Sequence, residues 1–289
     1  MIRDVRYHLR EWGEPGQPKV FLLHGWCDAS ISFQFTVDAL RHEWHVIAPD
    51  WRGFGRSGWN PGGAYWIPDY LADLDRLLEL ESPHEAARIV GHSLGGNVAL
   101  LYAGVRPERV AQLVAVEAYG RGDSAAGNAP EQLRGWLDQI KRPLHFRAHP
   151  DLRAFTRAMR FANPRLSETR AAFLAEHLTV RDENGRVCLS ADPAHRHVNP
   201  VLYRREEAEA CWRRISAQVL AVIQNDPAWR YSRDVDDVTW RNMQACFACY
   251  DERRIDDCGH NIHHDQPERL AACIEAFLLR HPHPLAHQE

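Results

Sequence analysis

The sequence predicts an α/β fold in which a mostly parallel central sheet is flanked by helices on both faces. Two observations predict it: short apolar runs of strand length stop at polar or glycine residues, and stretches of helical periodicity separate these runs. Parallel strands need crossover connections, which place helices on the faces of the sheet. The runs cover residues 20–23, 46–48, 88–90, 113–116 and 219–223, with a last strand over 254–257.

Polar residues stand at or just beyond the ends of these strands. In parallel sheets, ligands bind at the carboxyl ends of the strands, so these positions are candidates for a functional site. Between the second and third strands, leucines at helical spacing follow Asp69, the predicted N-cap of a helix. The strand-end residues are His24, Asp50, Ser93, Glu117 and Asp226.

A long segment without core-like strands interrupts this alternation. It runs over residues 120–210, which is too long for a simple connection. We therefore expect a helical cap (lid) inserted at 120–210 into a core formed by residues 1–119 and 211–289.

Start signals for helices and one hairpin lie inside the predicted cap. Asp151 and Ser167 each precede helical periodicity, and Asn199-Pro200 marks a third helix start. Asn184-Gly185 between two β-branched stretches predicts a hairpin. From residue 141 to 170, eight Lys or Arg stand against two acids, which is typical of a solvated helix face, with attraction of an anionic substrate as the alternative.

Composition and charge exclude several classes of partner. Lys and Arg number 35 against 39 Asp and Glu, so we expect no nucleic-acid partner. No apolar run approaches the roughly 18–20 residues that span a bilayer, and no secretory leader is visible, so we expect no membrane partner and a cytoplasmic location. Seven irregularly spaced cysteines indicate free thiols.

A nucleophile motif lies at the junction of the third predicted strand with the next helix. The sequence Gly-His-Ser-Leu-Gly at residues 91–95 follows a β-branched run and precedes a helical stretch. Glycines there permit a sharp turn that holds Ser93 in a strained conformation and exposes its hydroxyl. The following helix directs its first N–H groups at negative charge that develops beside Ser93.

At this point the sequence resembles the α/β-hydrolase superfamily, and the resemblance follows the chain in order. The matching stretches are His-Gly-Trp at 24–26, Asp-Trp-Arg-Gly-Phe-Gly-Arg-Ser at 50–57, the motif at 91–95, and Cys-Gly-His at 258–260 with Gln-Pro-Glu at 266–268. The resemblance implies an α/β-hydrolase fold. It also implies Ser93 as nucleophile, His260 as general base and the backbone N–H groups of Trp26 and Leu94 as oxyanion hole.

A serine hydroxyl needs a base with a pKa near 7, which supports His260 independently of the resemblance. The neighbouring His263, His264 and Asp265 raise a metal site as an alternative, but the spacing differs from that of a helix-borne zinc pair, so no metal is expected. Solvated or helix-capping roles are expected for His263 and His264.

Three further residues are expected beside the substrate pocket. His24 and His92 flank the loops at the strand ends, where they would orient these loops. Trp51 follows the second strand and adds an aromatic surface.

Two carboxylates compete for the third catalytic position, because both end a core strand between Ser93 and His260 in the chain. Glu117 resembles the Glu that haloalkane dehalogenases carry after the sixth strand. Asp226 occupies the commoner position after the seventh strand, but the usual glycine there is replaced by Gln224 or Asn225. The sequence favours Glu117 and leaves Asp226 as the alternative.

The function that these residues predict is that of a serine hydrolase, carboxylesterase-like (EC 3.1), which cleaves an ester, amide or thioester bond of a small apolar or aromatic substrate without a cofactor. We expect a monomer or homodimer. Two alternatives stay open: a cofactor-free ring-cleaving dioxygenase of the quinolone type, which resembles this chain at 25–27 and 50–53, and a non-catalytic binding protein. Those dioxygenases carry His where this chain has Asp28 and Leu94.

Overall fold

The computed structural model describes residues 1–280 and contains a seven-stranded sheet in the order β1-β3-β2-β4-β5-β8-β9. β1 runs antiparallel to β3, and every other neighbouring pair is parallel. The predicted α/β fold with a mostly parallel sheet is therefore confirmed. The strands are β1 (Leu9–Trp12), β2 (Lys19–Leu23), β3 (His45–Pro49), β4 (Ala87–His92), β5 (Val110–Val116), β8 (Gln218–Gln224) and β9 (Tyr250–Ile255).

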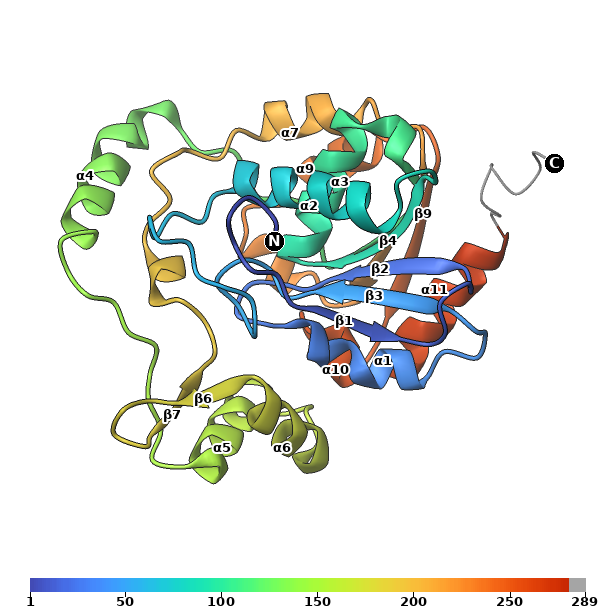
Figure 1. The fold of residues 1–289 in the computed structure, drawn as a ribbon. Coiled ribbons are helices and arrows are strands. Elements are labelled where there is room, and N and C mark those ends of the chain that lie inside the picture. The colour runs from blue at the N-terminus through green and yellow to red at the C-terminus, as the bar shows by residue number, and fades with distance from the viewer. Residues whose placement is uncertain (281–289) are drawn as a thin grey trace.

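Helices cover both faces of the sheet (Figure 1). One layer contains α2, α3 and α7, and the other contains α1 and α11. β5 is buried along its whole length because it lies between these layers, which explains its continuous apolar sequence. The helices of the core are α1 (Gln34–Asp38), α2 (Ile67–Glu81), α3 (Leu94–Val105), α7 (Arg205–Trp212), α8 (Ala228–Tyr231), α9 (Asp237–Gln244), α10 (Ile262–Asp265) and α11 (Pro267–Arg280).

The elements expected inside the cap are largely present. Asp151 and Ser167 cap their helices, because their side chains accept hydrogen bonds from Ala154 N and Arg170 N. The predicted hairpin pairs its two short strands antiparallel. The expected elements are α5 (Leu152–Ala162), α6 (Glu168–His177), β6 (Thr179–Arg181) and β7 (Val187–Leu189), and α4 (Ala129–Gln139) precedes them.

Two predicted helix starts are wrong. α2 begins at Ile67, two residues before Asp69, with Pro68 in its first turn, because proline at this position already has a helical φ. Asn199 opens no helix: its side chain accepts a hydrogen bond from Val201 N and closes a local turn. The next helix begins only at Arg205.

The sequence does not predict β1 or α4, and β9 begins and ends earlier in the chain than expected. The four residues of β1 include Arg and Glu, so no apolar run marks this edge strand, and α4 has no buried residue. The last strand ends at Ile255 and begins at Tyr250, earlier than the expected 254–257. Its charged residues hide the strand pattern.

The segment between β5 and β8 is attached to the loops at the carboxyl ends of the strands. Leu166 and Leu174 pack with Ala29 and Ile31, which follow β2. The backbone of Asp192 donates a hydrogen bond to the Gly53 carbonyl. Among the helices of residues 1–280, none is long and apolar enough to cross a membrane.

Candidate active site

Ser93 lies in a strained turn between β4 and α3. Its φ of 49° and ψ of −110° belong to a region that residues other than glycine rarely adopt. The turn is tight because the neighbouring glycines let the backbones approach: a Cβ on Gly95 would lie 2.3 Å from the Leu23 carbonyl oxygen. The strained elbow expected from the motif is therefore present.

His260 lies on the loop between β9 and α10, with its ring directed at Ser93. Its Nε2 is 2.9 Å from Ser93 Oγ, a distance at which the hydroxyl donates a hydrogen bond to the imidazole. The ring of Trp229 lies 4.4 Å away, centroid to centroid, and covers one side of the imidazole. Behind the loop, His92 Nε2 donates a hydrogen bond of 2.9 Å to the His260 carbonyl oxygen.

Glu117 occupies the position after β5 and faces the other nitrogen of the imidazole. Its Oε2 lies 3.3 Å from His260 Nδ1. The carboxylate is buried, and Gln224 satisfies it through both its backbone N–H, at 2.7 Å, and its side-chain amide, at 3.1 Å. The hydroxyl of Tyr119 donates a third hydrogen bond. These donors satisfy the buried carboxylate oxygens, which would otherwise lack hydrogen-bond partners away from water.

Asp226 lies elsewhere. Its side chain is exposed, and its Oδ1 accepts a hydrogen bond of 2.9 Å from Ala228 N within a local turn. The structure therefore brings Glu117, and not Asp226, to His260. Gln224, which replaces the glycine usual after this strand, is the residue that donates to Glu117.

The backbone expected to form the oxyanion hole lies against the serine. A Cβ on Gly25 would be 3.3 Å from Ser93 Cβ, so the loop that carries Trp26 passes directly beside the nucleophile. Leu94 is the first residue of α3, where N–H groups have no partner within the helix. The side chain of Trp26 is exposed.

His24, His92 and Trp51 are buried beneath the site rather than open to a substrate. His24 Nδ1 donates to the Gly25 carbonyl, its Nε2 accepts from Trp51 N, and the Trp51 indole donates to the His24 carbonyl. Burial lowers the pKa of His24 and His92, so both are neutral. These bonds join the loop after β2 to the loop after β3.

The expectation for His263 and His264 is wrong, because both side chains are buried. His263 Nε2 donates a hydrogen bond of 3.0 Å to Asp28 Oδ2, and its ring packs on Phe33. α10 turns these residues toward the sheet, and a sequence with four polar residues in succession carries no sign of this orientation.

Sequence reasoning also missed the roles of Gln224, Trp229 and Tyr119 around the histidine and the carboxylate. In the sequence, Gln224 differs from the glycine usual at this position, but nothing there indicates that it contacts Glu117. A polar residue that ends an apolar strand beside another strand-end carboxylate is the signal that could have identified it.

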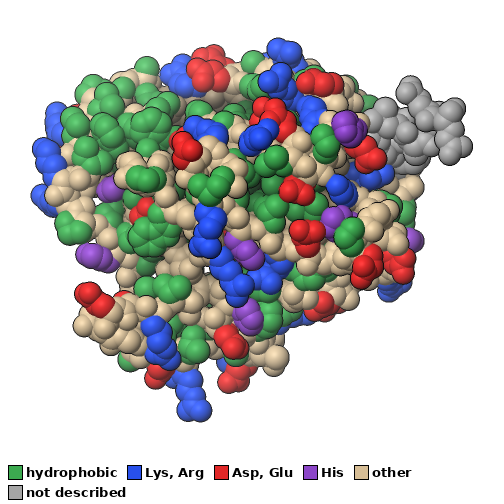
Figure 2. Space-filling view, in the orientation of Figure 1, with side chains coloured by type: hydrophobic (Ala, Val, Ile, Leu, Met, Phe, Trp, Pro, Cys, Tyr) green, Lys and Arg blue, Asp and Glu red, His purple; other side chains and the backbone are tan. Residues whose placement is uncertain are grey.

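A groove of about 250 Å³ lies between residues 62–66 and the segment that carries α4. Tyr65, Trp66 and Trp136 line it, whereas Ser93 and His260 do not. Figure 2 shows hydrophobic side chains gathered over α4, where Leu133 and Leu137 are exposed.

Several known proteins resemble this chain in sequence or in fold. A serine hydrolase-like protein of Danio rerio is 27% identical over 280 residues, which cover 92% of this chain and 83% of the relative. Epoxide hydrolase A of Mycobacterium tuberculosis is 40% identical over 119 residues, 39% of this chain and 35% of that protein. The thioesterase domain from the curacin biosynthetic pathway superposes with a TM-score of 0.82 at 25% identity, covering 93% of this chain and 95% of that one.

A family model described as the alpha/beta hydrolase fold matches residues 18–267. This range includes the strained serine, the carboxylate after β5 and the histidine that lies between them. The chain therefore belongs to the α/β-hydrolase family.

Proposed function

We propose that this protein is a serine hydrolase in which Ser93 is the nucleophile, His260 the general base and Glu117 the residue that orients His260. One observation carries the proposal: His260 Nε2 lies 2.9 Å from Ser93 Oγ, and the serine stands on a strained elbow. A serine hydroxyl becomes a competent nucleophile when such a base accepts its proton. Glu117 stabilises the imidazolium that forms.

The reaction follows from these positions. Ser93 Oγ attacks the carbonyl carbon of the substrate while its proton passes to His260 Nε2, and the carbonyl oxygen becomes an oxyanion. The N–H groups of Trp26 and Leu94 donate to this oxygen. His260 then gives its proton to the leaving group, and the ester of Ser93 forms. A water molecule, deprotonated by His260, releases the acid and restores Ser93.

The relatives support an acyl-transfer reaction. The zebrafish relative is named a serine hydrolase-like protein, and the structural neighbour is a thioesterase domain. The epoxide hydrolase relative matches a smaller part of this chain, 39% against 92% for the zebrafish relative. We propose a carboxylesterase-like activity (EC 3.1) on a small substrate with an apolar or aromatic acyl or leaving group.

A cytoplasmic location belongs to the same proposal. All seven cysteines, which lie within the described residues, are free thiols, as in a reducing compartment.

Ser93→Ala tests the proposal directly. The variant keeps the fold but lacks the nucleophile, so hydrolysis of p-nitrophenyl esters should fall by about 10³- to 10⁶-fold. A fluorophosphonate probe should add one adduct to the intact mass of the wild-type chain and none to the variant. A wild type without an adduct, or a variant that keeps full activity, contradicts the acyl-serine mechanism.

A further inference from the structure

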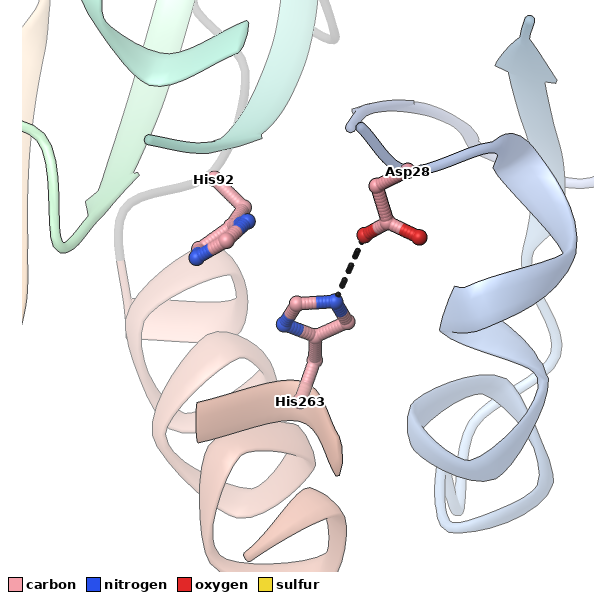
Figure 3. Close-up of side chains that lie close together, drawn as sticks. All are labelled: Asp28, His92 and His263. Carbon is pink, nitrogen blue, oxygen red and sulfur yellow. Dashed lines mark hydrogen bonds and ion pairs between the residues drawn. The ribbon is translucent and has the colours of Figure 1, made fainter. Parts of the chain in front are cut away.

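A second cluster of ligand-type side chains (Figure 3) is joined to the candidate active site by the hydrogen bond from His92 to the His260 carbonyl. It consists of Asp28 after β2, His92 at the end of β4 and His263 in α10, and all three side chains are buried. One ligand atom from each residue lies within 4.8 Å of the other two. The mechanism proposed above uses none of these side chains.

The geometry points to a binding site for a divalent transition-metal ion, with Zn²⁺ the best match, formed by Asp28, His92 and His263. Two imidazoles and one carboxylate are a donor set that zinc takes with a fourth position open, whereas Mg²⁺ and Ca²⁺ prefer oxygen ligands. The sequence predicts no such site because the three residues come from segments far apart in the chain.

The distances suit an ion of this size. Three atoms within 4.8 Å of one another leave a point about 2.8 Å or less from each, and zinc bonds to nitrogen and oxygen are about 2.0–2.2 Å long. Each donor therefore needs to move by less than about 1 Å. Side-chain rotation supplies such a movement.

The surrounding hydrogen bonds prepare these groups as ligands. His92 donates its Nε2 proton to the His260 carbonyl, which leaves Nδ1 as a lone pair, and Nδ1 has no partner among the described residues. Metal-binding histidines usually donate their second nitrogen to a carbonyl or carboxylate in this way. Asp28 accepts hydrogen bonds from Ala29 N and Ser32 Oγ, which fix its carboxylate.

Metal binding would also have to displace the proton that His263 shares with Asp28 in their hydrogen bond. His263 Nε2 now donates to Asp28, and the ion would take the place of this proton. His263 Nδ1 has no partner among residues 1–280 and can carry the proton instead. The ion would then bond to the lone pair left on Nε2.

Binding at this cluster would inhibit the enzyme, an effect that rests on the proposed function. His92 holds the His260 carbonyl, and His263 follows His260 by three residues. An ion that draws His92 and His263 together displaces the loop that carries His260, because both residues are attached to that loop. His260 Nε2 then loses its 2.9 Å contact with Ser93 Oγ, so kcat should fall while KM changes little.

Isothermal titration calorimetry on the chelator-treated full chain tests binding without any activity assay. The wild type should bind one Zn²⁺ with a dissociation constant below about 10 µM. Co²⁺ should give the visible absorption of a tetrahedral site, and Mg²⁺ should give no heat. A wild type that binds no Zn²⁺ in this range overturns the proposal.

Matched variants locate the ion. Asp28→Asn and His263→Gln should weaken Zn²⁺ binding by at least about 10-fold, because each removes one ligand. His84→Gln, which alters an exposed histidine, should bind like the wild type. His260→Ala should also bind Zn²⁺, since the His260 side chain supplies no ligand and meets the cluster only by ring packing on His92, at 4.9 Å between centroids. Loss of binding in His260→Ala would place the ion on the catalytic histidine and overturn the proposal.

Two measurements keep the test decisive. If circular dichroism shows that Asp28→Asn or His263→Gln is unfolded, the Co²⁺ spectrum of the wild type and the His260→Ala titration decide. Zn²⁺ should lower ester turnover of the wild type by at least about 10-fold, with recovery after chelation. If no ester is hydrolysed at all, the proposed function fails, while calorimetry still decides whether the metal site exists.

Discussion

Two strand-end carboxylates, Glu117 and Asp226, differ in burial and in the groups that they contact. Glu117 is buried, receives both donors of Gln224 and lies 3.3 Å from His260 Nδ1. Asp226 is exposed, and its Oδ1 accepts a hydrogen bond from Ala228 N in its own turn. The field of a buried carboxylate acts on a neighbouring imidazolium more strongly than that of an exposed one, because water screens the latter.

Replacement by the isosteric amides should therefore separate the two residues. Glu117→Gln should lower kcat by about 10²- to 10⁴-fold, because an amide cannot stabilise the imidazolium and can hold the wrong tautomer of His260. Asp226→Asn should lower kcat by less than about 10-fold. Steady-state kinetics of both variants on one ester gives the comparison. The reverse ranking would assign the orienting role to Asp226.

Among elements, α3 and α7 approach each other closely at the C-terminal end of α3. A Cβ placed on Gly104 of α3 would lie 2.0 Å from the carbonyl oxygen of Cys211 in α7. Backbone cannot yield as a flexible side chain does, so one of the helices must shift. α3 also begins at Leu94, directly after the nucleophile, and a shift along this helix reaches the active site.

Gly104→Ala should consequently lower the free energy of unfolding by about 1–3 kcal/mol, the usual cost of overpacking. Urea denaturation followed by circular dichroism measures this difference. Gly135→Ala is the matched control, since Gly135 lies in α4 and a Cβ there meets nothing within 4 Å. That change should leave stability unaltered or raise it by up to about 1 kcal/mol. Equal effects of both substitutions would contradict the packing argument.

For the whole molecule, the contact between the loop after β3 and the segment between β5 and β8 depends on a neutral histidine. His195 stacks between Phe54, at 3.8 Å, and Tyr65, at 3.7 Å, measured between ring centroids. Burial lowers the pKa of His195 from 6.5 to about 3. The folded protein thus binds this proton less readily than the unfolded chain, in which the ordinary pKa applies.

The sign of the pH dependence follows from linkage. The contribution of His195 to stability is fully present above pH 6.5 and is lost progressively as the pH falls toward 3, because only the unfolded chain takes up the proton in that window. Between pH 7.5 and pH 5.0 this group should cost about 2 kcal/mol. His195→Gln should show a smaller decrease in stability over this interval than the wild type or His84→Gln. Parallel decreases in all three proteins would exclude His195 as the cause.

The sequence by itself was sufficient for the parallel sheet and for the strained position of Ser93. Both depend on local signals: apolar runs form buried strands wherever they occur, and a glycine-flanked serine at a strand-to-helix junction permits one sharp turn. The same locality explains what was missed. β1 and β9 carry charged residues at the sheet edges, the true start of α2 depends on Pro68, and Asn199 closes a turn instead of opening a helix.

Only the tertiary structure decided which distant side chains meet. Glu117 reaches His260 and Gln224 reaches Glu117 because β5 lies between β4 and β8 in the sheet, a pairing that no local pattern specifies. The approach of His263 to Asp28 spans 235 positions in the chain and depends on how α10 packs beside the end of β2. Periodicity determines which face of an element is apolar, whereas strand order and helix packing determine what that face meets.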